Sequence, residues 1–333
     1  MSSSFNEKRR QQFLTQAYSS AHEKYLGEEV PYWKEGLYGV GDTEEERKSL
    51  ARSTYARFSY ELLSLRYTAG HPIEQLRSQL TGVVEAYEHY QKALADYEQI
   101  PEIAPLGMGN IGDYERCMQL IGLCYLLHRR DLLSRIAALE DPGYEGEDAL
   151  YEDLLAYELS DRTDTDELLH LELYDPLLGA MYDDTDEESK QDLNEYLNHW
   201  YPAFKYIPWH DGHLRIDGTE GDYFGYWAFE AGAVAYLCDI NDSHINHMIY
   251  PKDLVAWARA NKHLEQEVPV LTAGLRVPGG KACPQTGWWY TPKRFAALLQ
   301  SWRRHAQHRR QQLWRYLLAV GYASGESETV ILP

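Results

Sequence analysis

The stretch that decides the fold is GDYFGYWAFEAGAVAYLCDIND, residues 221–242. From Tyr223 to Cys238 it is apolar or aromatic on every side, and Glu230 is its only carboxylate. A helix that is hydrophobic all round belongs in the interior of a protein. The run is also shorter than the roughly 20 apolar residues that a bilayer requires. We therefore predict a central, buried core helix over residues 222–238.

Helical spacing would place Asp222, Tyr226 and Glu230 on one stripe of this helix, each four residues from the next. A buried carboxylate is costly unless it is hydrogen-bonded or paired with a cation. Glu230 is therefore either an internal tie between helices or a working group, and the sequence leaves both interpretations open. The residues of the predicted core motif are Asp222, Tyr223, Tyr226, Trp227, Glu230, Asp239 and Asp242.

The rest of the chain is helical in pattern as well. Leu and Ala are plentiful, β-branched runs are scarce, and 27 Tyr and 9 Trp among 333 residues indicate a tightly packed protein. We expect an all-α fold, a multi-helix bundle of antiparallel helices with a long aromatic-rich loop near the C-terminus. Besides the core helix, helices are predicted over residues 5–26, 44–67, 73–99, 147–158, 166–182, 185–198 and 252–261, and one or two over 113–139.

Proline and glycine residues suggest how these helices are grouped. Pro101 and Pro105, followed by a glycine-rich loop, separate an N-terminal helical region (1–105) from a second helical domain (106–263). Residues 264–333 are predicted to form a loop, with Trp288 and Trp289, and a C-terminal amphipathic helix. The arginines of that helix, Arg303 to Arg315, are a candidate surface for self-association into a homodimer.

Charge is distributed unevenly along the chain. The net charge is −20, and residues 140–197 hold 21 acidic residues against two basic ones, Arg162 and Lys190. Such a field repels nucleic acid and acidic lipid and speeds encounter with a basic partner. A solvated face that serves solubility is the alternative. The candidate contact residues of this acidic surface are Asp161, Asp164, Asp166, Asp183, Asp184, Asp186, Glu187 and Glu188.

Several other classes of protein lack support in the sequence. The first residues, MSSSFNEKRRQQ, have no apolar core typical of a secretory signal, and no window is apolar enough to span a membrane. The four cysteines, Cys117, Cys124, Cys238 and Cys283, are scattered and read as buried thiols. We expect a cytoplasmic protein with neither membrane nor nucleic acid as partner.

Motifs that carry chemistry are few. His210, Asp211 and His213 are the densest group of potential metal ligands, but the two histidines, three residues apart on a loop, have no third ligand at a defined spacing. Nucleophile elbows, phosphate-binding glycine loops and the HExxH pattern are absent from the sequence. We therefore expect no catalytic residue, metal or cofactor. The alternative is a helical-toroid glycoside hydrolase that uses Asp222 and Glu230 as its two carboxylates.

The central stretch resembles the C-terminal domain of PoNi proteins, the immunity proteins to PoNe nuclease toxins. The resemblance rests on Tyr-Trp-x-Phe-Glu-Ala-x-Ala at residues 226–233, on the acidic end at 239–242 and on Tyr-Pro-x-Asp-Leu at 250–254. Residues 276–292 are similar to a segment of other helical immunity proteins encoded beside type VI secretion and polymorphic toxins.

This resemblance implies a cytoplasmic bacterial protein that binds a toxin, in many cases a DNase, and blocks it without chemistry of its own. Nucleases need basic surfaces to hold phosphate backbones. The acidic surface is therefore the predicted contact with the cognate toxin, and the core motif is the predicted scaffold behind it.

Overall fold

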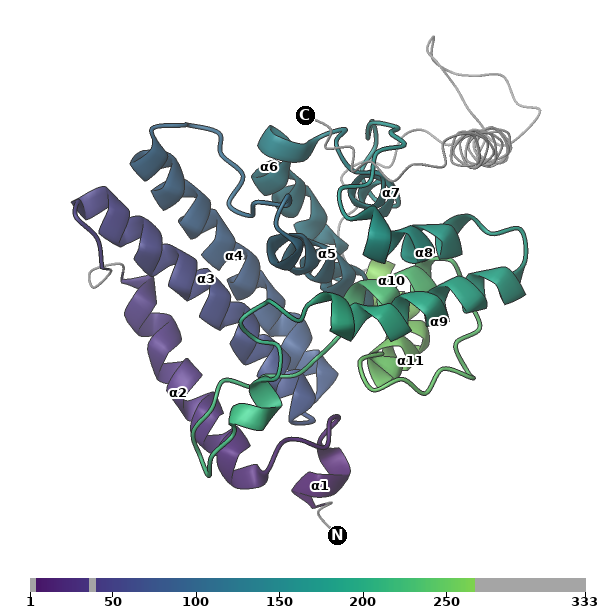
Figure 1. Ribbon diagram of the computed structural model, residues 1–333, viewed down its shortest axis with the longest axis horizontal. Coiled ribbons are helices and arrows are strands. Elements are labelled where there is room, and N and C mark those ends of the chain that lie inside the picture. Colours follow the sequence, from purple (N-terminus) through teal and green to yellow (C-terminus); the bar gives the residue numbers. More distant parts are fainter. Residues whose placement is uncertain (1–3, 36–39, 267–333) are drawn as a thin grey trace, which may run out of the picture. The chain divides into compact units, whose positions relative to one another are not determined.

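The computed structural model describes residues 4–35 and 40–266, which all belong to one compact unit, Met1–Gly274. Within these described ranges the chain forms eleven α-helices, three short 3-10 helices and no β-strand, so the all-α prediction is confirmed (Figure 1). The expected loop over 274–292, the arginine helix and Cys283 lie outside the described residues. The division of the chain at residue 105 stays a prediction.

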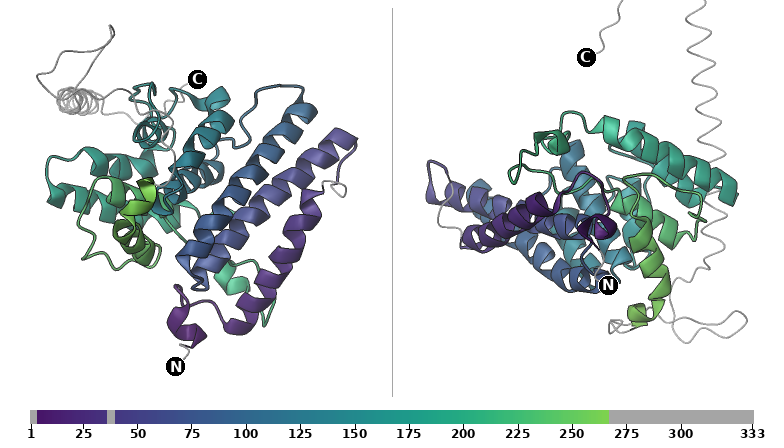
Figure 2. Two further views of the ribbon diagram at one scale, coloured as in Figure 1. Left: turned by 180° about the vertical axis from the view of Figure 1, so that it is seen from behind. Right: turned by 90° about the horizontal axis from the view of Figure 1, so that it is seen from below.

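Three long helices, α2 (Gln16–Lys34), α3 (Glu44–Thr68) and α4 (Ile73–Glu98), lie side by side as an antiparallel layer (Figures 1 and 2). Short α1 (Phe5–Lys8) precedes them, so the helix expected over 5–26 is divided. Thr43 begins α3 by accepting a hydrogen bond from the Glu46 amide at 3.1 Å. The three acids that follow Thr43 lie in the first turn, where the helix dipole favours negative charge.

The second half of the unit is built around α5 (Ile111–Leu126). The sequence predicted one or two helices over residues 113–139, and the structure has two, α5 and α6 (Leu133–Tyr144). The remaining helices are α7 (Ala149–Ala156), α8 (Leu171–Tyr182), α9 (Asp186–Ala203), α10 (Phe229–Leu237) and α11 (Lys252–Ala260). The backbones of α5 and α10 approach each other closely at Gly122. A Cβ atom at that position would lie only 2.8 Å from the Glu230 amide nitrogen.

The predicted core helix over 222–238 is wrong in its first half. Helix α10 begins only at Phe229, and residues 221–228 are not helical, although Tyr223 to Ala228 are all buried. Gly221 and Gly225 have φ angles of +145° and +123°, which are costly for other residues and incompatible with an α-helix. The stripe of Asp222, Tyr226 and Glu230 is therefore not formed.

Side chains from other parts of the chain replace the hydrogen bonds that a helix would have made. A buried carbonyl without a partner costs about 1–3 kcal/mol, so this segment needs external donors. The donors are Tyr18 to the Tyr223 carbonyl (2.9 Å), Thr68 to the Phe224 carbonyl (2.7 Å), Gln11 Nε2 to the Tyr226 carbonyl (2.5 Å) and Gln119 to the Trp227 carbonyl (2.6 Å). Gln11 Oε1 in turn accepts from the Tyr226 amide at 2.9 Å. We call residues 221–228 the buried segment; α2, α3 and α5 all bind it.

The structure predicts that Gly225→Ala strongly destabilises the protein. The new Cβ atom would overlap the Thr68 hydroxyl, and the positive φ angle disfavours alanine. We expect the free energy of unfolding, measured by urea denaturation, to fall by about 3 kcal/mol. Gly82→Ala is the control: Gly82 lies inside α4 with open space around it, and the same change there should raise stability by about 0.5–1 kcal/mol. Equal effects at the two sites would contradict the role of Gly225.

Candidate functional site

The eight predicted contact residues lie in two groups at opposite ends of α8 (Figure 1). Asp161, Asp164 and Asp166 belong to the connection between α7 and α8; we call them the α7–α8 group. Asp183, Asp184, Asp186, Glu187 and Glu188 surround the turn from α8 into α9 and form the α8–α9 group. Between the groups lie the twelve residues of α8, a helix about 18 Å long. All eight side chains are exposed except Asp183, which is half-buried.

Acids at and near the ends of the α7–α8 connection hold the α7–α8 group in place. Arg162, whose side chain is only 9% exposed, donates hydrogen bonds to Asp141 (both 2.8 Å) and to Glu152 (2.8 and 3.0 Å). Asp148 caps α7 by accepting from the Tyr151 amide at 2.8 Å, and it also accepts from the Leu169 amide at 3.0 Å. The connection is thus anchored from within, and α8 begins at residue 171 instead of the predicted 166.

Helix capping positions the α8–α9 group. The Thr185 hydroxyl accepts from the Glu188 amide at 3.2 Å and donates to the Glu188 carboxylate at 2.8 Å. Lys190 pairs with Asp186 at 2.5 Å and with Glu187 at 3.7 Å. Both acids also lie in the first turn of α9, where the helix dipole stabilises them. Glu187 remains 91% exposed despite its pairing.

The negative charge of residues 140–197 is mostly directed outward. Three of its acids, Glu140, Asp148 and Glu152, are buried, and burial raises the pKa of Glu140 well above its usual range. The only two basic side chains of the stretch are engaged by acids of the same stretch. Within this stretch only Lys190 offsets exposed acids near α8, because Arg162 is engaged by Asp141 and Glu152.

Glu230, in contrast, is an internal tie. Its side chain is fully buried, and Oε1 accepts hydrogen bonds from the Tyr196 hydroxyl at 2.6 Å and from the Trp200 indole at 3.0 Å. Its Oε2 has no hydrogen-bond partner among the described residues. Burial, with a smaller contribution from the charge of Glu115, raises the pKa of Glu230 to about 8. Glu230 is therefore mainly protonated at neutral pH and joins α9 to α10.

The other members of the core motif divide into buried and exposed residues. Tyr223, Tyr226 and Trp227 are buried; the Trp227 indole donates to Thr68 at 2.8 Å. Asp242 is buried as well, where it pairs with Arg259 and accepts from the Tyr250 hydroxyl at 2.7 Å. The two exposed members are Asp222, which pairs with Arg215 at 2.7 Å, and Asp239.

The two carboxylates of the hydrolase alternative do not share an accessible site. Asp222 lines a cavity of about 780 Å³, whereas Glu230 is enclosed and does not line it.

The potential metal ligands do not form a metal site. The His213 ring is hydrogen-bonded to the Tyr226 hydroxyl, and no cluster of three or more His, Cys, Asp or Glu side chains suited to a metal occurs in the described ranges. Among the helices of residues 4–35 and 40–266, none is long and apolar enough to cross a membrane.

Comparison with known proteins agrees with the resemblance seen in the sequence. Residues 146–254 match the family model "PoNe immunity proteins (PoNi), C-terminal", which confirms that resemblance. A crystal structure, "The Crystal Structure of Protein PA2201 from Pseudomonas aeruginosa", superposes with a TM-score of 0.57 at 20% identity, over 76% of this chain and 92% of that one. This likeness shows a shared fold. The comparison with curated proteins found no match.

The burial of Glu230 predicts a particular pH dependence of stability. Its pKa is raised from 4.5 to about 8, so between these values the folded state binds a proton that the unfolded state has lost. This contribution to stability is complete below about pH 4.5 and is lost as the pH rises through 8. Thermal unfolding midpoints should therefore decline over this range, and Glu230→Gln should flatten the decline. Glu187→Gln, at an exposed position, is the control. Identical pH profiles for Glu230→Gln and the unmodified protein would contradict the assignment.

Proposed function

We propose that this protein is an immunity protein that binds a cognate antibacterial nuclease toxin and neutralises it by contact, without catalysis. The observation that carries the proposal is the match of residues 146–254 to the C-terminal region of the PoNe immunity proteins. All eight candidate contact residues lie within the matched range. The toxin would be of the PoNe type, delivered by a type VI or polymorphic toxin system, and the protein would meet it in the cytoplasm.

Electrostatics supports a role for the acidic surface in this binding. A nuclease holds phosphate backbones with basic side chains, so its substrate surface is positively charged. Acids exposed at both ends of α8 can attract that surface and accelerate encounter, an effect that salt screens over about 10 Å at 0.1 M. Their anchoring by Arg162 and by the cap of α9 keeps most of this face ordered before the toxin arrives, which lowers the entropic cost of binding.

The decisive test of the proposed function is a rescue and co-purification experiment. A PoNe-type toxin should be expressed in bacteria with and without the full chain, while viability, DNA integrity and complex formation are followed. The proposal predicts rescue together with a stable complex. Toxin activity that is unaffected by the protein, with no complex formed, would reject it.

The role of the α8–α9 group can be tested separately by charge reversal. Asp186→Lys combined with Glu187→Lys should slow association with the toxin about tenfold or more at low salt and reduce its salt dependence, because the steering field is lost. The measurement is the association rate by surface plasmon resonance at several salt concentrations.

The chain offers a matched control for this variant. Thr43 to Glu46 at the start of α3 repeat the arrangement of Thr185 to Glu188: a threonine cap accepts from the amide three residues later, and acids fill the first turn. Glu44→Lys with Glu45→Lys should impose a similar loss of helix stability without slowing association. If the variants at α9 and at α3 bind equally fast, the α8–α9 group is only a solvated face.

A further inference from the structure

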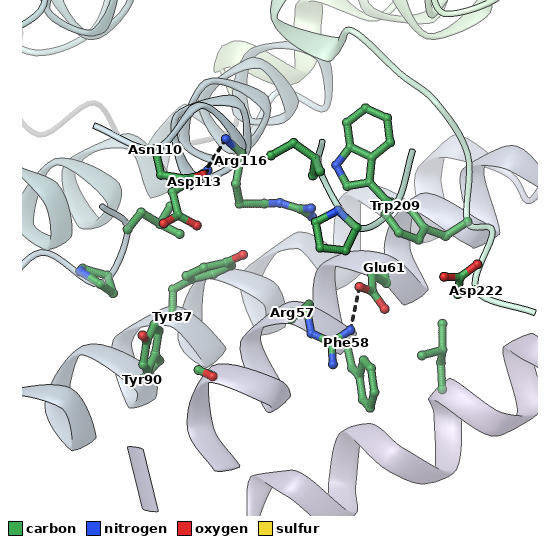
Figure 3. A pocket seen from close by; sticks show the side chains of 18 of the residues that line it. Arg57, Phe58, Glu61, Tyr87, Tyr90, Asn110, Asp113, Arg116, Trp209 and Asp222 are labelled. Atoms are coloured by element: carbon green, nitrogen blue, oxygen red, sulfur yellow. Dashed lines mark hydrogen bonds and ion pairs between the residues drawn. The ribbon is translucent and has the colours of Figure 1, made fainter. Parts of the chain in front are cut away.

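A cavity of about 780 Å³ opens between the N-terminal helix layer, the start of α5 and the chain that precedes α10 (Figure 3). Its volume falls in the range of roughly 300–1,000 Å³ typical of small-molecule sites. Phe58 and Tyr90 on one side and Trp209 on the other form aromatic walls. No residue of the acidic surface at the ends of α8 lines this cavity, so the proposed toxin contact leaves it unexplained.

Arg116 extends from α5 into this cavity (Figure 3). Its guanidinium carbon lies 3.3 Å from the centroid of the Tyr60 ring, and the enclosed Nη1 atom has no hydrogen-bond partner among the described residues. The neighbouring acids Asp113 and Glu115 form no ion pair with it in that part of the chain. An enclosed donor without an acceptor costs about 1–3 kcal/mol, and more when it is charged. Arg116 as a whole is half-buried and lines the cavity, so its guanidinium is placed to receive an acceptor from outside the protein.

Two further polar residues line the cavity. Tyr87 is only 4% exposed and points its hydroxyl toward Arg116 (Figure 3). The Nε2 atom of His22, also on the cavity lining, is enclosed and has no hydrogen-bond partner among the described residues. Several potential donors therefore converge on one space.

The acids that line the cavity are already engaged. Asp222 is held by Arg215 at 2.7 Å, Glu61 by Arg57 at 3.1 Å, and Asp113 accepts a hydrogen bond from the Gly107 amide at 3.3 Å. Burial also raises the pKa of both Glu61 and Asp113. Arg116 is the cation of the lining that has no ion pair within the part of the chain that the structure describes, since Arg57 is held by Glu61. A ligand of negative charge fits it best.

We propose that this cavity binds a small organic acid, whose carboxylate or phosphate oxygens accept hydrogen bonds from Arg116 and Tyr87 while a planar body lies against Trp209, Phe58 and Tyr90. This inference goes beyond the immunity function and does not depend on it. A carboxylate ligand and a phosphate ligand would be recognised in the same way, since each presents adjacent acceptor oxygens to a guanidinium group.

Binding can be tested on the full chain with probes that share one ring and differ in charge. These are phenylacetate, phenyl phosphate, the neutral 2-phenylethanol and the cation 2-phenylethylamine, each titrated by isothermal calorimetry. At least one anion should bind at least about tenfold more tightly than the neutral and cationic probes, because only an anion pairs with the guanidinium. The anion that binds more tightly shows whether the site prefers a carboxylate or a phosphate ligand. Tighter binding of the cation, or no binding of either anion at millimolar concentration, would overturn the proposal.

Variants assign the binding to this cavity. Arg116→Met should weaken anion binding about tenfold or more, and Tyr87→Phe should weaken it severalfold. Arg52→Met is the matched control, because Arg52 also has an enclosed, unpaired Nη1 among the described residues but does not line this cavity. Anion affinity that survives in folded Arg116→Met, or that falls equally in Arg52→Met, would reject the site. If Arg116→Met does not fold, Tyr87→Phe decides: unchanged affinity in that variant rejects the proposal.

Discussion

The structure depends on the hydrogen bonding of one buried, non-helical segment, residues 221–228. In water its backbone groups would be solvated, and in a helix they would bond to one another; here they are satisfied by Gln11, Tyr18, Thr68 and Gln119. Each of these side chains comes from a distant part of the chain, so the layer of α2 to α4, helix α5 and α10 are held together through the same segment. Burial of its aromatic side chains provides the apolar driving force, and these polar bonds determine its position.

The sequence identifies this stretch as central but not its conformation. A continuous apolar run is consistent with either a buried helix or a buried extended segment, because periodicity cannot separate the two when every side is covered. The local signal was Gly221 and Gly225, which a helix does not need and a segment with positive φ angles does. The partners Gln11 and Thr68 are more than 150 residues away and carry no recognisable motif. The prediction is accurate to within one residue for α3, which has a capping threonine, and for α4, which has a regular apolar face.

The candidate site shows the same division between what composition reveals and what packing decides. Counting charges locates the acidic stretch correctly, yet it cannot tell that Asp148 and Glu152 turn inward to anchor a loop while Asp161 and Glu187 face solvent. Nor does it show that α8 separates the exposed acids into two groups. The cavity around Arg116 had no sequence signal, since its walls come from α3, α4, α5 and the chain before α10. A single arginine in an apolar helix becomes significant only when its neighbours fail to pair with it.

These observations bear on how the region matched to PoNe immunity proteins works. Residues 146–254 include both acidic groups and the buried segment, but three of the four side chains that satisfy that segment lie before residue 70 and the fourth lies on α5. Without them the segment would leave buried carbonyls unpaired, at a cost of about 1–3 kcal/mol each, comparable in sum to the net stability of a typical domain. The matched region is therefore part of a larger folding unit. The N-terminal helices form the structural support that lets the C-terminal region present a fixed acidic face.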